Sequence, residues 1–195
     1  MFLTKDNDDI KETIWYNFKK QTKGVSKMKK LTFAIMGMGN RGTAYAAKQL
    51  KYPEEMAVVA MADTRRIRLD AANKYLHLPE DRLFDGADSI LAQPKLADVM
   101  IIATQDAQHR EHALRAMELG CDVITEKPMT IDEKRAQAII DAQKRTGRNV
   151  RVSFNYRYAP HNTKVRELLM DGVIGDVYSV HFEWYLNTSH GADYY

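Results

Sequence analysis

The chain of 195 residues contains a single cysteine, Cys121, which excludes an internal disulfide framework and fits a reducing compartment. Its 10 glycines and 5 prolines are too few for collagen-like or low-complexity classes. No apolar run approaches the roughly 18–20 residues of a membrane span, and no secretory signal is recognisable. The 29 basic and 26 acidic residues are well mixed, unlike those of a dedicated nucleic-acid binder. We therefore predict a cytoplasmic protein that binds neither membranes nor nucleic acid.

Three segments of different character follow one another along the chain. Residues 1–27 are polar and end in a lysine-rich stretch, so we interpret them as an N-terminal extension that is partly helical or disordered. Residues 28–150 alternate short apolar runs with helical stretches. Residues 151–195 resemble the start of a second domain of α+β type. At roughly 100–200 residues per domain, we expect that second domain to be incomplete in this chain.

The alternation in residues 28–150 predicts an α/β fold, a doubly wound parallel sheet of the Rossmann kind. Each short run is apolar throughout, as in strands that helices cover on both faces. The predicted strands are Leu31–Met36, Ala57–Ala62, Asp98–Ala103 and Asp122–Thr125. The first predicted helix is Thr43–Leu50. The second is Ala107–Leu119, which ends at Gly120 and has on its apolar face Arg110, Ala113, Leu114 and Met117. The third runs from a Thr130–Glu133 capping box to Gly147 and has on its apolar face Ala136, Ile139 and Ile140.

A different pattern begins after Gly147. Asn149–Tyr158 is predicted to be a strand, Pro160–Asp171 a helix and Val177–Tyr185 a second strand. The last of these alternates in polarity, which is typical of a sheet with one covered face. Its aromatic row favours sheet packing or a contact between copies of the chain over a sugar platform, so we expect a homo-oligomer through this C-terminal sheet. The row consists of Tyr178, Phe182 and Trp184.

The strongest local motif is the glycine-rich segment Gly37-Met38-Gly39-Asn40-Arg41-Gly42, which follows an apolar strand and precedes a helix. In such a turn Gly37 permits the tight bend, Gly39 lets the backbone approach a pyrophosphate, and Gly42 lets the helix pack closely on the strand. The helix N-terminus offers free N–H groups and partial positive charge to phosphates. The motif predicts a dinucleotide-binding loop.

Asp63 ends the next predicted strand, about 20 positions after the loop. A carboxylate at that spacing accepts hydrogen bonds from the adenosine ribose, and its charge would repel a 2′-phosphate, which favours NAD as the cofactor. Arg65 or Arg66 could accept such a phosphate, so NADP remains possible.

With Glu126-Lys127-Pro128 at a strand end, the sequence resembles the Gfo/Idh/MocA oxidoreductases over residues 30–195. The other features that carry this resemblance are the glycine loop, a strand ending in Ala103-Thr104, a following His109, and Asn155-Tyr156-Arg157-Tyr158. The resemblance implies an N-terminal Rossmann domain that binds NAD(P) and a C-terminal domain that holds a sugar or cyclitol. It therefore implies an NAD(P)-dependent dehydrogenase with a small-molecule sugar or polyol substrate.

The resemblance also assigns roles to individual positions. Asp63 would hold the adenosine ribose, Glu126 would lie near the nicotinamide ribose, and Lys127 would lie beside the nicotinamide and the reacting carbon. Pro128 would fix the backbone behind Lys127, and the Lys127–Pro128 bond is a candidate cis peptide bond. The remaining cofactor-binding residues, in the loop, in the groove beyond the fourth strand and at the nicotinamide pocket, are Gly37, Met38, Gly39, Asn40, Arg41, Gly42, Thr104, His109, Asn155 and Arg157.

Lys127 is the predicted catalytic residue, because an ammonium beside the alcohol oxygen stabilises a developing alkoxide and can relay its proton. Members of the family usually carry a histidine acid/base further along, and none of His161, His181 and His190 matches that position. We therefore expect a truncated member that binds the dinucleotide but catalyses poorly. The alternatives are an NAD-dependent glycosidase and a non-catalytic dinucleotide-binding module. No metal site is expected, because His109 and His112 have no evident third ligand.

Overall fold

The computed structural model describes residues 29–185, which fall into two compact units. The larger unit runs to Asn155 and contains a parallel sheet, and the smaller unit begins at Tyr156. The extension predicted for residues 1–27 lies outside the described residues. Among the described residues, no helix is both long and apolar enough to cross a membrane.

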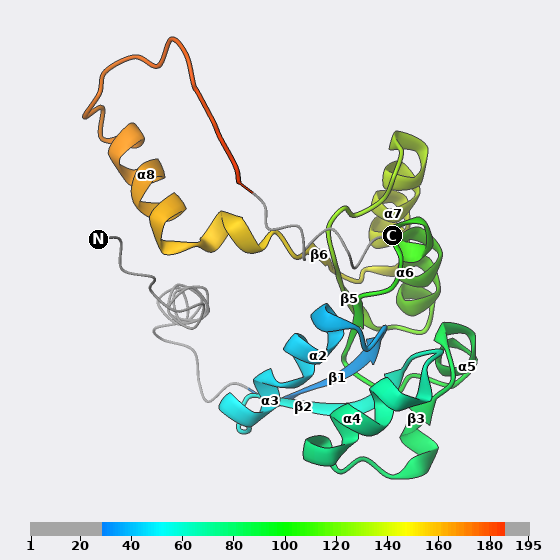
Figure 1. The fold of residues 1–195 in the computed structure, drawn as a ribbon. Helices are drawn as coiled ribbons and strands as arrows, with labels where there is room; N and C mark the ends of the chain where they lie inside the picture. The colour runs from blue at the N-terminus through cyan, green and yellow to red at the C-terminus, as the bar shows by residue number, and fades with distance from the viewer. Residues whose placement is uncertain (1–28, 186–195) are drawn as a thin grey trace. The chain divides into compact units, whose positions relative to one another are not determined.

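The larger unit is built on a six-stranded parallel sheet with the strand order β3-β2-β1-β4-β5-β6 (Figure 1). From β1 the chain passes outward to β2 and β3, then returns to lay β4 on the other side of β1. In open α/β sheets this reversal places ligand sites at the carboxyl ends of the strands. The strands are β1 (Leu31–Met36), β2 (Met56–Ala62), β3 (Leu83–Phe84), β4 (Val99–Ile102), β5 (Asp122–Thr125) and β6 (Val150–Val152).

Two apolar cores cover the two faces of this sheet, because successive side chains of a strand point to opposite faces. In β1, Ala34 and Met36 pack into one core and Ile35 into the other. The first core is closed by α5 (Ala87–Leu91), α6 (His109–Glu118) and α7 (Glu133–Thr146), and the second by α2 (Asn40–Ala46) and α4 (Arg66–Leu76). A short helix, α3 (Lys48–Lys51), follows α2. The predicted doubly wound α/β fold is confirmed.

The start of α7 differs from the prediction. Asp132, not Thr130, is its N-cap, and the Asp132 carboxylate accepts the backbone N–H of Arg135 at 2.8 Å. This bond satisfies one of the helix's unpaired N–H groups. The helix buries Ile139 and Ala142, while Ile140, predicted on the buried face, is 43% exposed. It ends, as predicted, at Gly147, which has φ +67°.

The other helices of the larger unit also depart from expectation in part. The helix predicted from Thr43 begins at Asn40, directly at the glycine loop. The buried face of α6 is formed by His109, His112, Ala113, Ala116 and Met117, so two expected members, Arg110 and Leu114, are only half-buried. The helix ends at Glu118 with Leu119 as its C-cap, and Gly120 follows with φ +83°, close to the predicted end.

The strand predicted over Asn149–Tyr158 is mostly wrong. Pairing with β5 stops after β6 (Val150–Val152), and Asn155–Tyr158 form a single 3₁₀ turn. β6 is the edge strand on this side of the sheet, and the larger unit ends shortly after it, at Asn155.

Between Tyr156 and Tyr185, the described part of the smaller unit, lies the helix α8 (Pro160–Met170), with proline at its first position, as predicted for this segment. The second predicted strand, Val177–Tyr185, is not formed: no ladder partner for it lies within the described residues. Its alternation is typical of a strand, but a strand needs a neighbour to bond its backbone groups. Its aromatic rings instead contact one another: Trp184 lies edge-on to Tyr156 at 5.1 Å and stacks on Phe182 at 5.9 Å between centroids.

Candidate functional site

The glycine loop at the end of β1 uses its three glycines for different purposes. Gly37 has φ +87°, and a Cβ there would lie 2.4 Å from the carbonyl oxygen of Ala103. A Cβ at Gly42 would lie 1.8 Å from the carbonyl oxygen of Gly37. At Gly39, by contrast, a Cβ would meet one neighbour, Arg68 Nη1 at 4.0 Å. Gly37 and Gly42 are therefore needed for packing, whereas Gly39 leaves an open backbone surface.

That open surface lies at the N-terminus of α2. Gly39 is the N-cap residue, and no side chain caps the helix. The Met38 side chain is buried in the core, so the residue takes part in the loop through its backbone. Backbone N–H groups at a helix start, with no Cβ in the way, fit the negative charge of a pyrophosphate.

Asp63, directly after β2, binds the backbone of the glycine loop. Its carboxylate is buried and accepts the backbone N–H of Met38 at 2.7 Å and that of Arg65 at 2.8 Å. The Arg68 guanidinium lies further away, with Nη1 at 3.5 Å from Asp63 Oδ2. A carboxylate has about four acceptor positions, so it can still accept ribose hydroxyls, but this contact remains a prediction.

A cavity of about 90 Å³ adjoins Asp63 where β2 and β3 end. Arg66, one of its lining residues, is tied to two exposed carboxylates: Asp70 Oδ1 at 2.7 Å from Nε and Glu80 Oε2 at 2.8 Å from Nη2. Hydrogen bonds to Glu80 and Asp70 raise the pKa of the Arg66 guanidinium, and Arg66 lowers the pKa of Glu80. The lining residues are Asp63, Thr64, Arg66, Leu69, Leu83 and Asp85.

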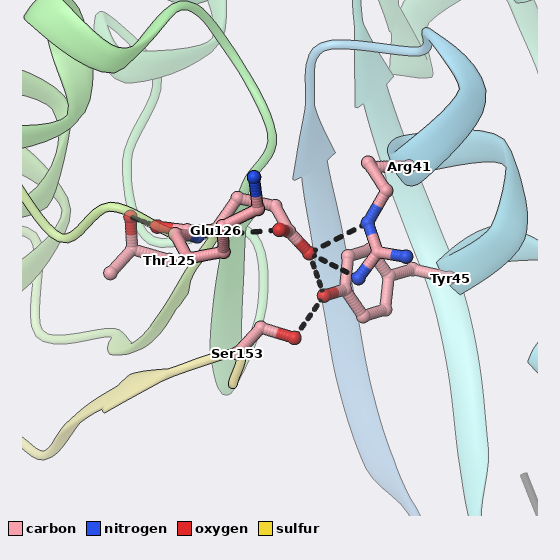
Figure 2. Close-up of polar contacts among 6 residues, drawn as sticks. Arg41, Tyr45, Thr125, Glu126 and Ser153 are labelled. Carbon is pink, nitrogen blue, oxygen red and sulfur yellow. Dashed lines mark hydrogen bonds and ion pairs between the residues drawn. The ribbon is translucent and has the colours of Figure 1, made fainter. Parts of the chain in front are cut away.

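Glu126, at the end of β5, is the centre of a second polar cluster (Figure 2). Its buried Oε1 accepts hydrogen bonds from Arg41 Nε at 3.0 Å and Nη2 at 2.8 Å, and from the Tyr45 hydroxyl. The Tyr45 hydroxyl also contacts the hydroxyl of Ser153, and Glu126 Oε2 accepts the backbone N–H of Lys127 at 3.3 Å. This cluster connects α2 with the ends of β5 and β6.

The cluster shifts the acidity of its members. Burial and the hydrogen bond with Glu126 raise the pKa of Tyr45 to about 12, so the phenol is neutral at physiological pH. Partial burial acts to lower the pKa of Arg41, but its hydrogen bonds with Glu126 and the charge of that carboxylate outweigh this effect and raise it. Glu126 therefore has a permanent cation and a neutral hydroxyl as partners. Its predicted contact with the nicotinamide ribose is untested.

Lys127 follows Glu126 and is exposed, and its bond to Pro128 is cis, as predicted. Beneath this turn lies His109, which is fully buried. Its Nδ1 lies 2.8 Å from the carbonyl oxygen of Pro128 and its Nε2 lies 3.1 Å from that of Thr104. His109 thus links the turn after β5 to the turn after β4. A contact between His109 and a cofactor remains a prediction.

Thr104 also contacts His112, with Oγ1 at 3.0 Å from Nδ1, and burial lowers the pKa of His112. Of the two predicted pocket residues further along, Asn155 ends the sheet unit, with its backbone N–H donating to Ser153 O at 3.1 Å. Arg157 belongs to the smaller unit, so its predicted role is not tested. No group of three or more His, Cys, Asp or Glu within residues 29–185 could hold a metal ion.

The predicted site residues of the larger unit, which do not include Arg157, thus follow the carboxyl ends of the strands, on both sides of the glycine loop. Residues 31–154 match the model of an oxidoreductase family with an NAD-binding Rossmann fold, Gfo/Idh/MocA. The chain belongs to the Gfo/Idh/MocA family. Sequence reasoning missed Tyr45, Ser153 and Arg68, which have no motif of their own; the helical spacing of Tyr45 from Arg41 was the one available signal.

Relatives within the Gfo/Idh/MocA family are recognisable in sequence and in structure. A Bacillus subtilis protein named as an oxidoreductase, YteT, is 32% identical over 86% of this chain and 40% of its own length. D-glucoside 3-dehydrogenase of Escherichia coli is 29% identical over 76% of this chain and 41% of its own. The chain therefore spans less than half the length of these relatives.

Solved structures share the fold. Scyllo-inositol dehydrogenase from Lactobacillus casei, determined with NAD(H) and scyllo-inositol, aligns with a TM-score of 0.68 at 21% identity, covering 76% of this chain and 43% of that one. The WlbA dehydrogenase from Bordetella pertussis, in complex with NADH and UDP-GlcNAcA, aligns with a TM-score of 0.69 at 23% identity, covering 76% and 44%.

Proposed function

We propose that this chain binds NAD(P) across the glycine loop and serves the oxidation or reduction of a hydroxyl group on a sugar or polyol. The observation that carries the proposal is the open backbone surface at Gly39. Asp63 follows β2 on one side of it, and Glu126 and Lys127 follow β5 on the other. A dinucleotide laid across the loop would reach both groups.

The residues of the loop fit this cofactor. The start of α2 would hold the pyrophosphate, Asp63 the adenosine ribose, and the turn at Lys127 would border the nicotinamide. When bound, NAD(P) accepts or donates the hydride. Position and charge are the contribution of the protein's own side chains.

Lys127 is the residue that we expect to touch the reacting hydroxyl. Its ammonium would stabilise negative charge on the alcohol oxygen and carry its proton. Glu126 is a positioning residue in this account, because its carboxylate binds the Lys127 backbone N–H while Arg41 and Tyr45 hold that carboxylate. The position of Lys127 would then depend on α2, the same helix that begins at the pyrophosphate site.

The substrate class is inferred from the relatives, which include a D-glucoside 3-dehydrogenase and several inositol 2-dehydrogenases. A cytoplasmic location, a homo-oligomer and weak turnover by a chain of this length remain predictions. The alternatives, a glycosidase and a non-catalytic binding module, make different predictions for the same assay.

The test combines binding and turnover. NADH fluorescence titrations and assays on a panel of sugars and polyols would compare the wild type with Lys127→Met and, as a matched exposed lysine on α7, Lys144→Met. We expect all three proteins to bind NADH and Lys127→Met alone to lower turnover, by about 10²-fold.

Each alternative has its own signature in this assay. Cleavage of an aryl glycoside without net NADH would favour the glycosidase. Binding of NADH without any turnover by the wild type would favour the binding module. Failure of the wild type to bind either nucleotide would overturn the proposal.

A further inference from the structure

We propose that Arg68 determines the dinucleotide preference of this chain, by supplying the cation that a phosphate on the adenosine 2′-oxygen requires. The chain would then bind NADP as well as NAD. The inference rests on the proposed function and deepens it, because it concerns the adenosine end of the same site.

Three arginines follow Asp63, and each has different partners in the structure. The Arg66 guanidinium is engaged with Asp70 and Glu80. Arg65 is the N-cap residue of α4 and binds Asp63 through its backbone N–H. Arg68 Nη1 lies 3.5 Å from Asp63 Oδ2 and 4.0 Å from where a Cβ on Gly39 would be. Its guanidinium therefore lies between the ribose carboxylate and the open pyrophosphate surface.

The contact of Arg68 with Asp63 is loose enough to be shared with a ligand. At 3.5 Å it is longer than an ordinary charge-assisted hydrogen bond, and the Arg68 side chain is 42% exposed. Asp63, by contrast, is held by the backbone N–H groups of Met38 and Arg65. Arg68 can thus turn towards a phosphate without removing the groups that hold Asp63 in place.

Electrostatics also favour Arg68 as the residue that would bind a 2′-phosphate. An isolated carboxylate at the end of β2 would repel a 2′-phosphate, which is the usual physical basis for preferring NAD. Arg68 offsets the charge of Asp63, and a planar guanidinium can bind two phosphate oxygens at once. The cavity that adjoins Asp63 does not include Arg68; it is lined by a second carboxylate, Asp85, and its arginine, Arg66, is already paired. A phosphate is therefore favoured on the Arg68 side.

The experiment is a pair of fluorescence titrations, with NADH and with NADPH, at one ionic strength. The wild type, Arg68→Gln, and the matched controls Arg65→Gln and Arg66→Gln would be compared. We expect the wild type to bind both nucleotides. Losing the charged contact in Arg68→Gln should weaken NADPH binding about tenfold or more and change NADH binding less than about threefold. Both controls should leave the ratio of the two affinities within about threefold of the wild-type ratio.

A second measurement avoids any variant. Displacement of NADH from the wild type by 2′,5′-ADP and by 5′-AMP, which lacks only the 2′-phosphate, should show 2′,5′-ADP to be at least as effective. An NADPH affinity far below that of NADH in the wild type, an unchanged ratio in a folded Arg68→Gln, or a loss carried by Arg65→Gln would overturn the proposal for Arg68. If the wild type bound neither nucleotide, the proposed function itself would fail, which is a distinct result.

Discussion

The two buried carboxylates on either side of the glycine loop, Asp63 and Glu126, are each 6% exposed but are held in different ways. Asp63 binds mainly backbone N–H groups, of Met38 in the loop and of Arg65 two residues later. Glu126 binds mainly side chains, Arg41 and Tyr45, which come from a helix far away in the sequence. The end of the loop at Asp63, where we propose that the adenosine binds, is thus held by the backbone, and the end at Glu126 depends on the side chains of α2.

This difference has consequences for stability and for binding. Removing the charge of Glu126 leaves Arg41 without its anion and weakens the link between α2 and the end of β5. Removing the charge of Asp63 leaves two N–H groups that an amide oxygen can still accept in part. Stability should therefore depend more on Glu126, and nucleotide binding should depend more on Asp63.

The largest effect is expected inside the loop that separates the two carboxylates. Gly42→Ala would place a methyl group 1.8 Å from a backbone oxygen, so unfolding should become easier by about 3 kcal/mol or more. Gly39→Ala meets open space, so its stability should change by less than about 1 kcal/mol while NADH binding weakens about tenfold, because the methyl group would cover the pyrophosphate surface. Urea unfolding and NADH titration measure both, and equal loss of stability in the two variants would contradict the assignment of Gly39 to the ligand.

The next largest effects are expected at the two carboxylates themselves, Glu126 and Asp63. Glu126→Gln should cost about 2 kcal/mol of unfolding free energy, below the full cost of a broken buried pair because the Arg41 side chain is 46% exposed. Asp63→Asn should cost about 1 kcal/mol and weaken NADH binding more than Glu126→Gln does. Chemical unfolding and titration of both variants give the two rankings. The same ranking in both measurements would show that the two ends do not differ as described.

The smallest effect concerns Tyr45. Tyr45→Phe removes the hydrogen bonds to Glu126 and Ser153, so we expect a loss of about 1 kcal/mol at pH 7. Burial, with the bond to Glu126, raises the pKa of the folded tyrosine to about 12, above the unfolded value of about 10. The raised pKa stabilises the fold fully below pH ~10, and this contribution is lost as the pH rises through about 12.

Unfolding of the wild type and of Tyr45→Phe across this pH window measures that contribution. The stability difference between the two proteins should shrink as the pH rises. A difference that stays constant from pH 9 to pH 12 would place Tyr45 outside the buried cluster.

The four central strands, the glycine loop, the position of Asp63 after β2 and the cis bond at Lys127 were all predictable, because each depends on a local pattern or on residue types at fixed spacing. The short strand β3 carries no such pattern and was missed. The Tyr45–Glu126–Ser153 cluster was not, because its contacts join residues more than 80 positions apart. The position of Arg68 over Gly39 depends on how α4 packs, which no short motif encodes.

The errors have physical causes as well. At the start of α7 the sequence offers both Thr130 and Asp132 as caps, and only geometry shows that Asp132 reaches the N–H of Arg135. The alternation of Val177–Tyr185 is typical of a strand, but pairing is a property of two segments, and within the described residues that segment has no partner.

The central claim is that a dinucleotide lies across Gly39 between Asp63 and Lys127. A crystal structure of the chain grown with NADH tests it most directly. We expect the pyrophosphate to lie against the start of α2, with the adenosine ribose at Asp63 and the nicotinamide next to Lys127. A nicotinamide ring directed away from Lys127, or a nucleotide bound elsewhere on the protein, would contradict it.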